Sequence, residues 1–132
     1  MKRPLHEGDL PWDVFAAGGR QELRAKALCD QGGKARLGVG LLELPAGSDT
    51  RPPHYHSHEE EHLYVLSGRV ILCLGPEEFE LGAGGYASFP AGQEIFHHLE
   101  NRSEAPVRYL MIGERIAADR VTHDHTSPEP TR

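Results

Sequence analysis

The sequence predicts an all-β domain built as a sandwich or a barrel. Fifteen glycines and ten prolines interrupt the 132 residues at short intervals, and most segments between them are too short for helices of average length. Several of these segments are apolar and rich in residues that favour strands. About eight or nine short strands at this spacing are typical of a sandwich or a barrel.

The expected strands follow one another along the chain. The run from 36 to 44 is apolar and ends at Pro45, and the run from 63 to 74 divides at Ser67-Gly68 into what we interpret as a hairpin. Further strands are expected within EFELG, YASFPAG, IFHHLEN and PVRYLMIGE. The segment 20–30 stays open, because its composition suits a helix whereas a barrel would use it as an entry strand.

The length of the chain predicts one domain, since 132 residues bury a real core but are too few for two ordinary domains. Both ends are polar and contain proline, so we expect a flexible arm at 1–12, a single barrel domain at 13–118 and a disordered tail at 119–132. Cys29 and Cys73 lie far apart and outside any CxxC, which predicts two reduced core thiols.

Charge and hydropathy argue against two classes of partner. The formal net charge is −6 and the chain has no run of Lys or Arg, which disfavours nucleic acid. No window approaches the roughly 20 apolar residues that cross a bilayer, and the start MKRPLHEGDLPWD has no apolar signal core. We therefore expect a soluble cytoplasmic protein that binds neither nucleic acid nor a membrane.

The histidines carry the main functional signal. Six of the nine fall in two places, His54 to His62 and His97 to His98. The others, His6, His123 and His125, lie in the polar ends, where we expect solvent exposure.

The first cluster, HYHSHEEEH, permits two interpretations. From His58 to His62 it has the H-E-x-x-H spacing that places two histidines on one face of a helix. Pro52 and Pro53 hold the approach extended, and a β-rich run begins directly after the cluster. The further H-x-x-G-x-x-H ligand pattern of metalloproteases is absent, so the extended interpretation is favoured.

On an extended chain, His54 and His56 point to the same side. Glu61 lies an odd number of residues from both histidines, so on one continuous strand it would point to the opposite side. A turn within 57–60 must therefore return it to the same interior. From Glu61 onward, Leu63 and Val65 would line the interior, and the opposite face would carry His62, Tyr64 and Leu66.

The second cluster follows a turn marked by Pro90 and Gly92. On the strand that follows, His97 and His98 point to opposite faces, so one of the two can face the first cluster.

These residues resemble the two motifs of the cupin family. The first corresponds to GSDTRPPHYHSHEEEHLYVLSG, with Gly47, His54, His56, Glu61 and Gly68. The second corresponds to GGYASFPAGQEIFHHLEN, with Gly84, Pro90, Gly92, His97 and Asn101. The resemblance spans 47–101 and implies a double-stranded β-helix, the jelly-roll barrel of cupins.

The motifs depart from the family pattern in three places. One extra residue precedes His54 and two precede His97, and such insertions in turns cost little. The spacing to Asn101 favours His97 over His98 as the inward histidine. Gly85 stands where many cupins have Asp.

The resemblance implies that one divalent metal is bound by His54, His56, Glu61 and His97. Three imidazoles and a carboxylate suit Zn, Fe, Mn, Ni or Co and leave room for water or substrate. The alternative is a barrel whose polar site holds water or an organic ligand without a metal. His58 is a candidate substrate contact or alternative ligand, whereas His62 and His98 are expected to face outward or toward a partner subunit.

The resemblance further implies a small polar metabolite as ligand, with a sugar-phosphate isomerase-like or oxygenase-type reaction; the alternative is a non-catalytic binding or sensing protein. An isomerase would need a base, for which the nearest candidates are His58, Glu59 and Glu60. It would also need cations at the barrel mouth, for which the candidates are Arg51, Arg69, Arg102 and Arg108. Because cupins often dimerise, we expect a homodimer that involves 20–44.

Overall fold

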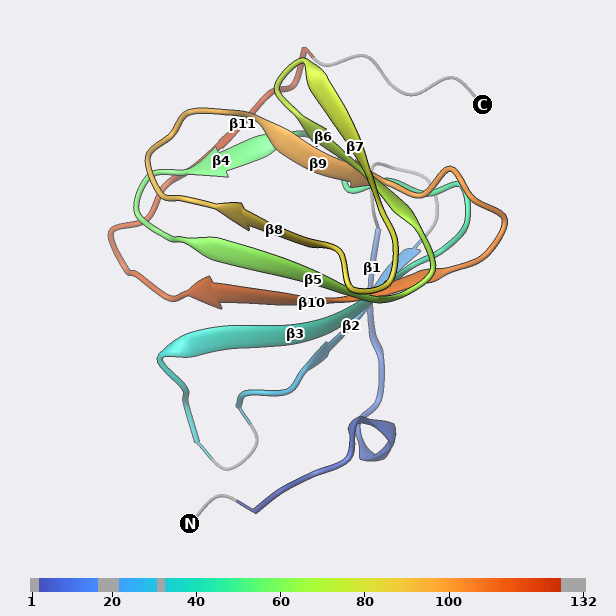
Figure 1. Ribbon diagram of the computed structural model, residues 1–132. Coiled ribbons are helices and arrows are strands. Elements are labelled where there is room, and N and C mark those ends of the chain that lie inside the picture. Colours follow the sequence, from blue (N-terminus) through green and yellow to red (C-terminus); the bar gives the residue numbers. More distant parts are fainter. Residues whose placement is uncertain (1–2, 17–21, 31–32, 127–132) are drawn as a thin grey trace.

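Two antiparallel β-sheets face each other in the computed structural model, which describes residues 3–16, 22–30 and 33–126 (Figure 1). The six-stranded sheet has the order β1 (Asp13–Ala16), β2 (Glu22–Ala27), β3 (Leu37–Leu44), β10 (Val107–Glu114), β5 (Glu61–Ser67) and β8 (Tyr86–Phe89). The five-stranded sheet has the order β11 (Val121–His123), β4 (His54–His56), β9 (His97–Glu100), β6 (Val70–Leu74) and β7 (Glu77–Leu81). The predicted all-β jelly-roll architecture is confirmed.

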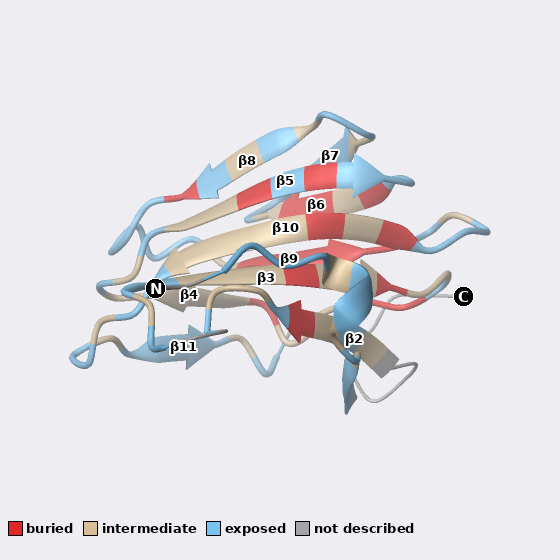
Figure 2. Cartoon of the chain, turned by 90° about the horizontal axis from the view of Figure 1, so that it is seen from below, coloured by how far each residue is buried: buried red, intermediate tan, exposed pale blue. Residues whose placement is uncertain are grey.

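The hydrophobic core lies between the facing sides of the sheets. Leu63 and Val65 on β5 are fully buried, whereas Tyr64 and Leu66 on the same strand are 44% and 43% exposed, which confirms the predicted alternation. Figure 2 shows this change between buried and exposed positions along β5. Other core residues are Leu44, Val70, Leu72, Phe89, Leu99, Val107 and Tyr109.

The chain changes sheets at Gly68, so the hairpin predicted for 63–74 is wrong. β5 pairs with β8 and β10, whereas β6 pairs with β7 and β9 in the opposite sheet. Gly68 has a φ of 83°, and a Cβ there would lie 2.6 Å from the carbonyl oxygen of Pro106. A strand–glycine–strand pattern does not distinguish a hairpin from such a crossing, because both need a residue with positive φ.

The segment 20–30, left open between helix and strand, forms strand β2 in its described part. β2 pairs with β1 and β3, as an entry strand would. The preceding arm contains a short 3₁₀ helix (η1, Glu7–Asp9) and contacts the sheet, because Lys26 Nζ donates to the Glu7 carboxylate at 2.6 Å. The Lys26 ammonium also lies 4.4 Å from the centroid of the Trp12 ring. Among the described residues, no helix is long and apolar enough to span a membrane.

The C-terminal segment differs from the expected disordered tail at 119–132. Residues 119–126 are described, and β11 pairs with the edge of β4 so that His123 lies opposite His54. Strand pairing uses backbone groups, so a polar segment without apolar periodicity can still complete a sheet edge. Residues 127–132 lie outside the described part of the chain.

A buried charge cluster covers the outer side of β9. Glu100 accepts hydrogen bonds from Arg51 at 2.9 Å and Arg102 at 3.0 Å, and it contacts His98 Nε2 at 2.7 Å. His98 was expected to face outward, and it does point away from the core, but this cluster buries it. Burial and the neighbouring Glu100 carboxylate raise the pKa of Cys73 to about 12, so this free thiol stays protonated.

Replacing Glu100→Gln would remove the buried carboxylate charge that accepts hydrogen bonds from Arg51 and Arg102. We expect the free energy of unfolding, measured by urea denaturation, to fall by about 3 kcal/mol. The matched control is Glu80→Gln, which removes an exposed pair with Arg69 and should cost less than about 1 kcal/mol. Equal effects of the two variants would contradict a structural role for the cluster.

The stability contributed by Glu100 should depend on pH. Burial opposes ionisation of this carboxyl, but hydrogen bonds from His98, Arg102 and Arg51 lower its pKa from 4.5 to about 2. The contribution is therefore present above pH 4.5 and is lost as the pH falls from 4.5 toward 2. Urea denaturation across this range should show the wild type losing its advantage over Glu100→Gln.

Candidate metal centre

The four predicted ligand residues come from both sheets and meet at one end of the barrel. β4 directs His54 and His56 to the interior, and His54 is paired with His97 on the neighbouring strand β9. Glu61 is the first residue of β5 in the opposite sheet. The bend at 57–60 carries the chain from one sheet to the other, which provides the predicted return of Glu61 to the same interior.

The Glu61 carboxylate is the centre of this group. Its Oε1 atom lies 3.1 Å from His56 Nε2 and 3.9 Å from the Nε2 atoms of both His54 and His97. The rings of His54 and His97 have centroids 4.6 Å apart. His54, His56 and Glu61 offer ligand atoms close enough together to hold a metal ion, and His97 borders them.

Two atoms of this group are buried without a hydrogen-bond partner in the described structure: Oε1 of Glu61 and Nε2 of His97. Buried polar atoms are nearly always hydrogen-bonded, because an unpaired one costs about 1–3 kcal/mol. Both atoms face the space between the three imidazoles. A transition metal accepts nitrogen and carboxylate ligands together, so the donor set fits such an ion.

Protonation also suits metal binding. Burial, and then the nearby His54, lower the pKa of His97 to about 4, so its imidazole is neutral near pH 7. Burial alone would raise the pKa of Glu61, but the imidazoles of His54, His56 and His97 outweigh it and lower that pKa. Neutral imidazole and ionised carboxylate are the forms that coordinate metals.

The structure distinguishes His97 from His98. The His97 ring stacks on Phe89, with centroids 3.9 Å apart and planes 8° apart, and its Nε2 faces Glu61. Phe89 on β8 lies opposite Glu61 on β5. The strand pairing therefore places Glu61 next to the ring on which His97 stacks. His98 lies on the opposite side of the strand in the Glu100 cluster, which favours His97 as the inward histidine.

The acidic and basic residues between the two sheets have other partners. His58 Nδ1 lies 2.7 Å from Ser57 Oγ, and Glu59 Oε2 accepts the Ile116 amide at 2.8 Å. Glu60 binds His62 Nε2 at 2.6 Å on the outside of the barrel. His62 thus faces outward as expected, where it also contacts the Tyr86 hydroxyl at 2.6 Å.

The C-terminal segment adds residues that the sequence analysis placed in a tail. Asp119 Oδ2 lies 2.7 Å from His56 Nδ1, and the His123 ring centroid lies 6.0 Å from that of His54. Their proximity depends on the pairing of β11 with β4. The only hint in the sequence is a cluster of Asp and His within THDH and the residues before it.

A cleft of about 320 Å³ lies beside Glu61, and its lining combines small residues with charged ones, among them Lys26, Glu114 and Arg115. Its small residues are Ala25, Ala27, Gly38, Gly40 and Gly113. Arg115 also lines a neighbouring cleft of about 510 Å³ together with Lys34, Arg36 and Glu59.

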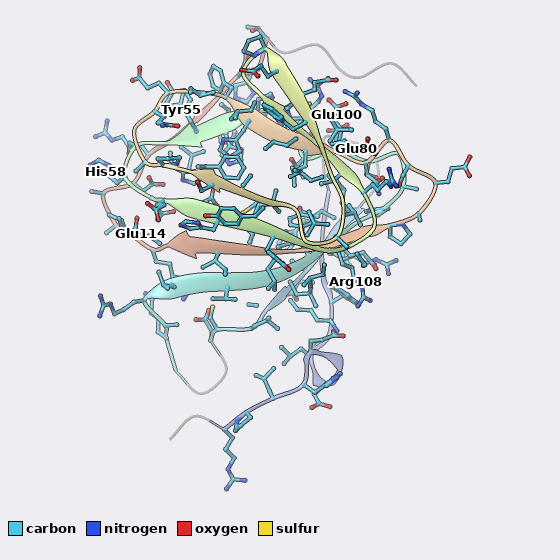
Figure 3. All side chains as sticks on the ribbon, in the orientation of Figure 1. Tyr55, His58, Glu80, Glu100, Arg108 and Glu114 are labelled. Carbon is cyan, nitrogen blue, oxygen red and sulfur yellow. The ribbon has the colours of Figure 1, made fainter. Side chains whose placement is uncertain are left out.

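The four arginines expected at the barrel mouth lie elsewhere. Arg51 and Arg102 bind Glu100, Arg69 binds Glu80, and Arg108 binds Glu43. Figure 3 shows Glu80 and Arg108 toward the end of the barrel opposite His58 and Glu114. The cations that line the cleft beside Glu61 are Lys26 on β2, which pairs with Glu7, and Arg115 after β10, which pairs with Asp30. Lys34 and Arg36 line the neighbouring cleft.

The fold and site define a jelly-roll barrel with a histidine- and glutamate-lined interior. Residues 40–113, more than half of the chain, match the family described as Cupin domain, and the chain belongs to this family. The chain is similar to the crystal structure of a sugar phosphate isomerase of the cupin superfamily from Silicibacter pomeroyi, with a TM-score of 0.81. The identity is 26%, and the match covers 93% of this chain and 82% of the other.

Two relatives are similar over a shorter region. Quercetin 2,3-dioxygenase of Bacillus subtilis is 34% identical over 65 residues, which are 49% of this chain and 19% of that protein. An uncharacterized protein of Streptomyces coelicolor is 35% identical over 65 residues, 48% of this chain and 59% of that protein. The match thus spans less than two thirds of the length of either relative.

Gly113 offers a test of how tightly Glu61 is held. A Cβ at Gly113 would lie 3.3 Å from Glu61 Cγ, so Gly113→Ala should displace the carboxylate by a few tenths of an ångström. We expect about tenfold weaker Co²⁺ binding in a competition titration. Gly82→Ala is the control, since no atom lies within 4 Å of its added Cβ. Unchanged affinity in Gly113→Ala would contradict a ligand role for Glu61 that depends on a fixed carboxylate position.

Proposed function

We propose that this cupin binds one divalent transition metal, Zn, Fe, Mn, Ni or Co, and uses it on a small polar metabolite. The proposed ligands are His54, His56, Glu61 and His97. The observation that carries the proposal is the pair of buried atoms, Glu61 Oε1 and His97 Nε2, that face one another without a hydrogen bond. Coordination to one ion would satisfy both.

A metal at such a site supplies Lewis acidity toward a carbonyl, or activates water or dioxygen. The chain would contribute ligands and an open cleft of a size that suits a small molecule. The small residues that line the cleft leave space next to Glu61. As a metal ligand, Glu61 would not serve as a free base.

Two reaction types are supported by different observations. A sugar-phosphate isomerase-like reaction is favoured by Lys34 and Arg36 in the neighbouring cleft, which can attract an anionic substrate, and by the similarity to the Silicibacter pomeroyi protein. An oxygenase-type reaction is favoured by the 65-residue similarity to quercetin 2,3-dioxygenase. The oxygenase-type reaction requires no protein base beyond the metal site.

A non-catalytic binding or sensing role is the alternative, and one observation favours it. The three candidate bases, His58, Glu59 and Glu60, each already contact another group at 2.6–2.8 Å. Turnover assays of the metal-loaded protein on sugar phosphates separate the two classes. Binding of a sugar phosphate without turnover would favour the sensing role.

The expected homodimer and cytoplasmic location stay predictions. An observation that supports association is the set of exposed apolar side chains on the outer side of the six-stranded sheet, among them Tyr64, Leu66 and Tyr86. Sedimentation of the untagged protein at micromolar concentration would measure its oligomeric state.

Elemental mass spectrometry of untagged protein tests the metal site. We expect about one metal per chain in the wild type and loss of that metal in His56→Ala and His97→Ala, because each variant removes one of four ligands. His62→Ala is the matched control, since this histidine faces outward and should keep the metal. Full metal content in both ligand variants, or none in the reconstituted wild type, would contradict the proposal.

A further inference from the structure

Asp119 is the residue outside the proposed ligand set that contacts it most closely. Its Oδ2 atom lies 2.7 Å from Nδ1 of His56. Its Oδ1 atom accepts hydrogen bonds from the backbone amides of His58 and Glu59, both at 2.9 Å. The Asp119 side chain is 6% exposed, so little of its own surface contacts solvent.

The backbone around Asp119 is held on both sides. The Asp119 amide donates to the Ile116 carbonyl at 3.0 Å, which closes the turn before β11. Arg120 donates to Ser57 Oγ at 2.8 Å, and Ser57 donates to the Arg120 carbonyl at 3.0 Å. The carboxylate therefore has a fixed position relative to β4.

A carboxylate at Nδ1 determines which nitrogen of a neutral imidazole is free. Asp119 can only accept, so the His56 proton belongs on Nδ1. Nε2 then carries the lone pair, and it is the atom that lies 3.1 Å from Glu61 Oε1 inside the site. The hydrogen bond also fixes the plane of the ring.

From this geometry we propose that Asp119 is a positioning residue of the metal centre: it holds His56 in the tautomer that binds a metal through Nε2. This inference rests on the proposed metal-binding function. It assigns to the segment after β10 a role in the site, because that segment carries the carboxylate that selects the ligand atom. Mutation of a carboxylate that accepts a hydrogen bond from the non-coordinating nitrogen of a metal-binding histidine typically lowers metal affinity about 10- to 100-fold.

A second arrangement uses the same residues differently. His56, Glu59 and Asp119 offer ligand atoms close enough to hold a metal through Nδ1 instead. Part of this donor set is already engaged, because Asp119 Oδ1 accepts the amides of His58 and Glu59, and Glu59 Oε2 accepts the Ile116 amide. Oε1 of Glu59 lies 3.7 Å from His56 Nδ1. The tautomer of His56 separates the two arrangements.

The sharpest variant is Asp119→Asn. The amides of His58 and Glu59 require an oxygen at the Oδ1 position, so the new NH₂ group must face His56 Nδ1. It donates to Nδ1 and moves the imidazole proton to Nε2, the wrong atom for ligation. The backbone contacts of the loop are kept, so urea denaturation of the metal-free variant should match the wild type more closely than Asp119→Ala does.

Two measurements report on the variant. Long-range ¹⁵N correlation spectra of metal-free protein, recorded at alkaline pH, show which nitrogen of the neutral His56 imidazole carries the proton. Competition titration with Co²⁺ gives the metal affinity, and the Co²⁺ absorption spectrum reports the coordination. Glu114→Gln is the control, because it also removes a negative charge at this end of the barrel, and its carboxylate accepts a hydrogen bond from the Glu60 amide instead of contacting His56.

We expect the proton on Nδ1 in the wild type and on Nε2 in Asp119→Asn, with Co²⁺ binding about 10- to 100-fold weaker in the variant and unchanged in Glu114→Gln. A proton on Nε2 in the wild type overturns the inference, as does equal Co²⁺ affinity in the wild type and Asp119→Asn. An equal loss in Glu114→Gln also overturns it, because loss of charge would then explain the effect. The expected tautomers in a wild type that binds no Co²⁺ support the positioning by Asp119 and refute the proposed metal function instead.

Discussion

The arrangement of the barrel interior depends on a carboxylate with one oxygen buried between imidazoles from the opposite sheet. Oε1 of Glu61 reaches across from β5 toward His54, His56 and His97, and it has no hydrogen-bond partner in the described structure. Burial of an ionised group without compensation is expensive, and the neighbouring imidazoles offset only part of that cost. This constraint makes the two sheets interdependent at one end of the molecule, where a cation would bring the largest gain in stability.

The short strand β4 is positioned by its neighbours rather than by its own length. It has three residues, and it lies between β9, which carries His97, and β11, which follows Asp119. The bend between β4 and β5 is fastened to the segment after β10 through hydrogen bonds of Ser57 and Asp119. Movement of the C-terminal segment would therefore shift two proposed ligands together, so the stability of this part of the fold and the geometry of the site are coupled.

The sequence predicted the features that depend on local pattern. Alternation along β5 identified Leu63 and Val65 as interior, and the motif spacing favoured His97 as the inward histidine. It did not predict the sheet crossing at Gly68, because positive φ serves a hairpin and a crossing alike. Asp119 was missed for another reason: backbone hydrogen bonds around it and the pairing of β11 bring it to His56, and these leave no apolar periodicity to recognise.

The two sides of β9 show why residue types alone do not define a metal site. His98, Glu100 and Cys73 on one side are as close together as the ligands on the other, and all are buried. There, however, Arg51 and Arg102 already supply the positive charge and hydrogen bonds that Glu100 requires, and the Cys73 thiol stays protonated. Around Glu61 no arginine or lysine of the described chain lies within ion-pair distance of the carboxylate, and only imidazoles approach it. The difference in available cations, rather than in histidines or carboxylates, makes the inner side the candidate metal centre and the outer side a structural cluster.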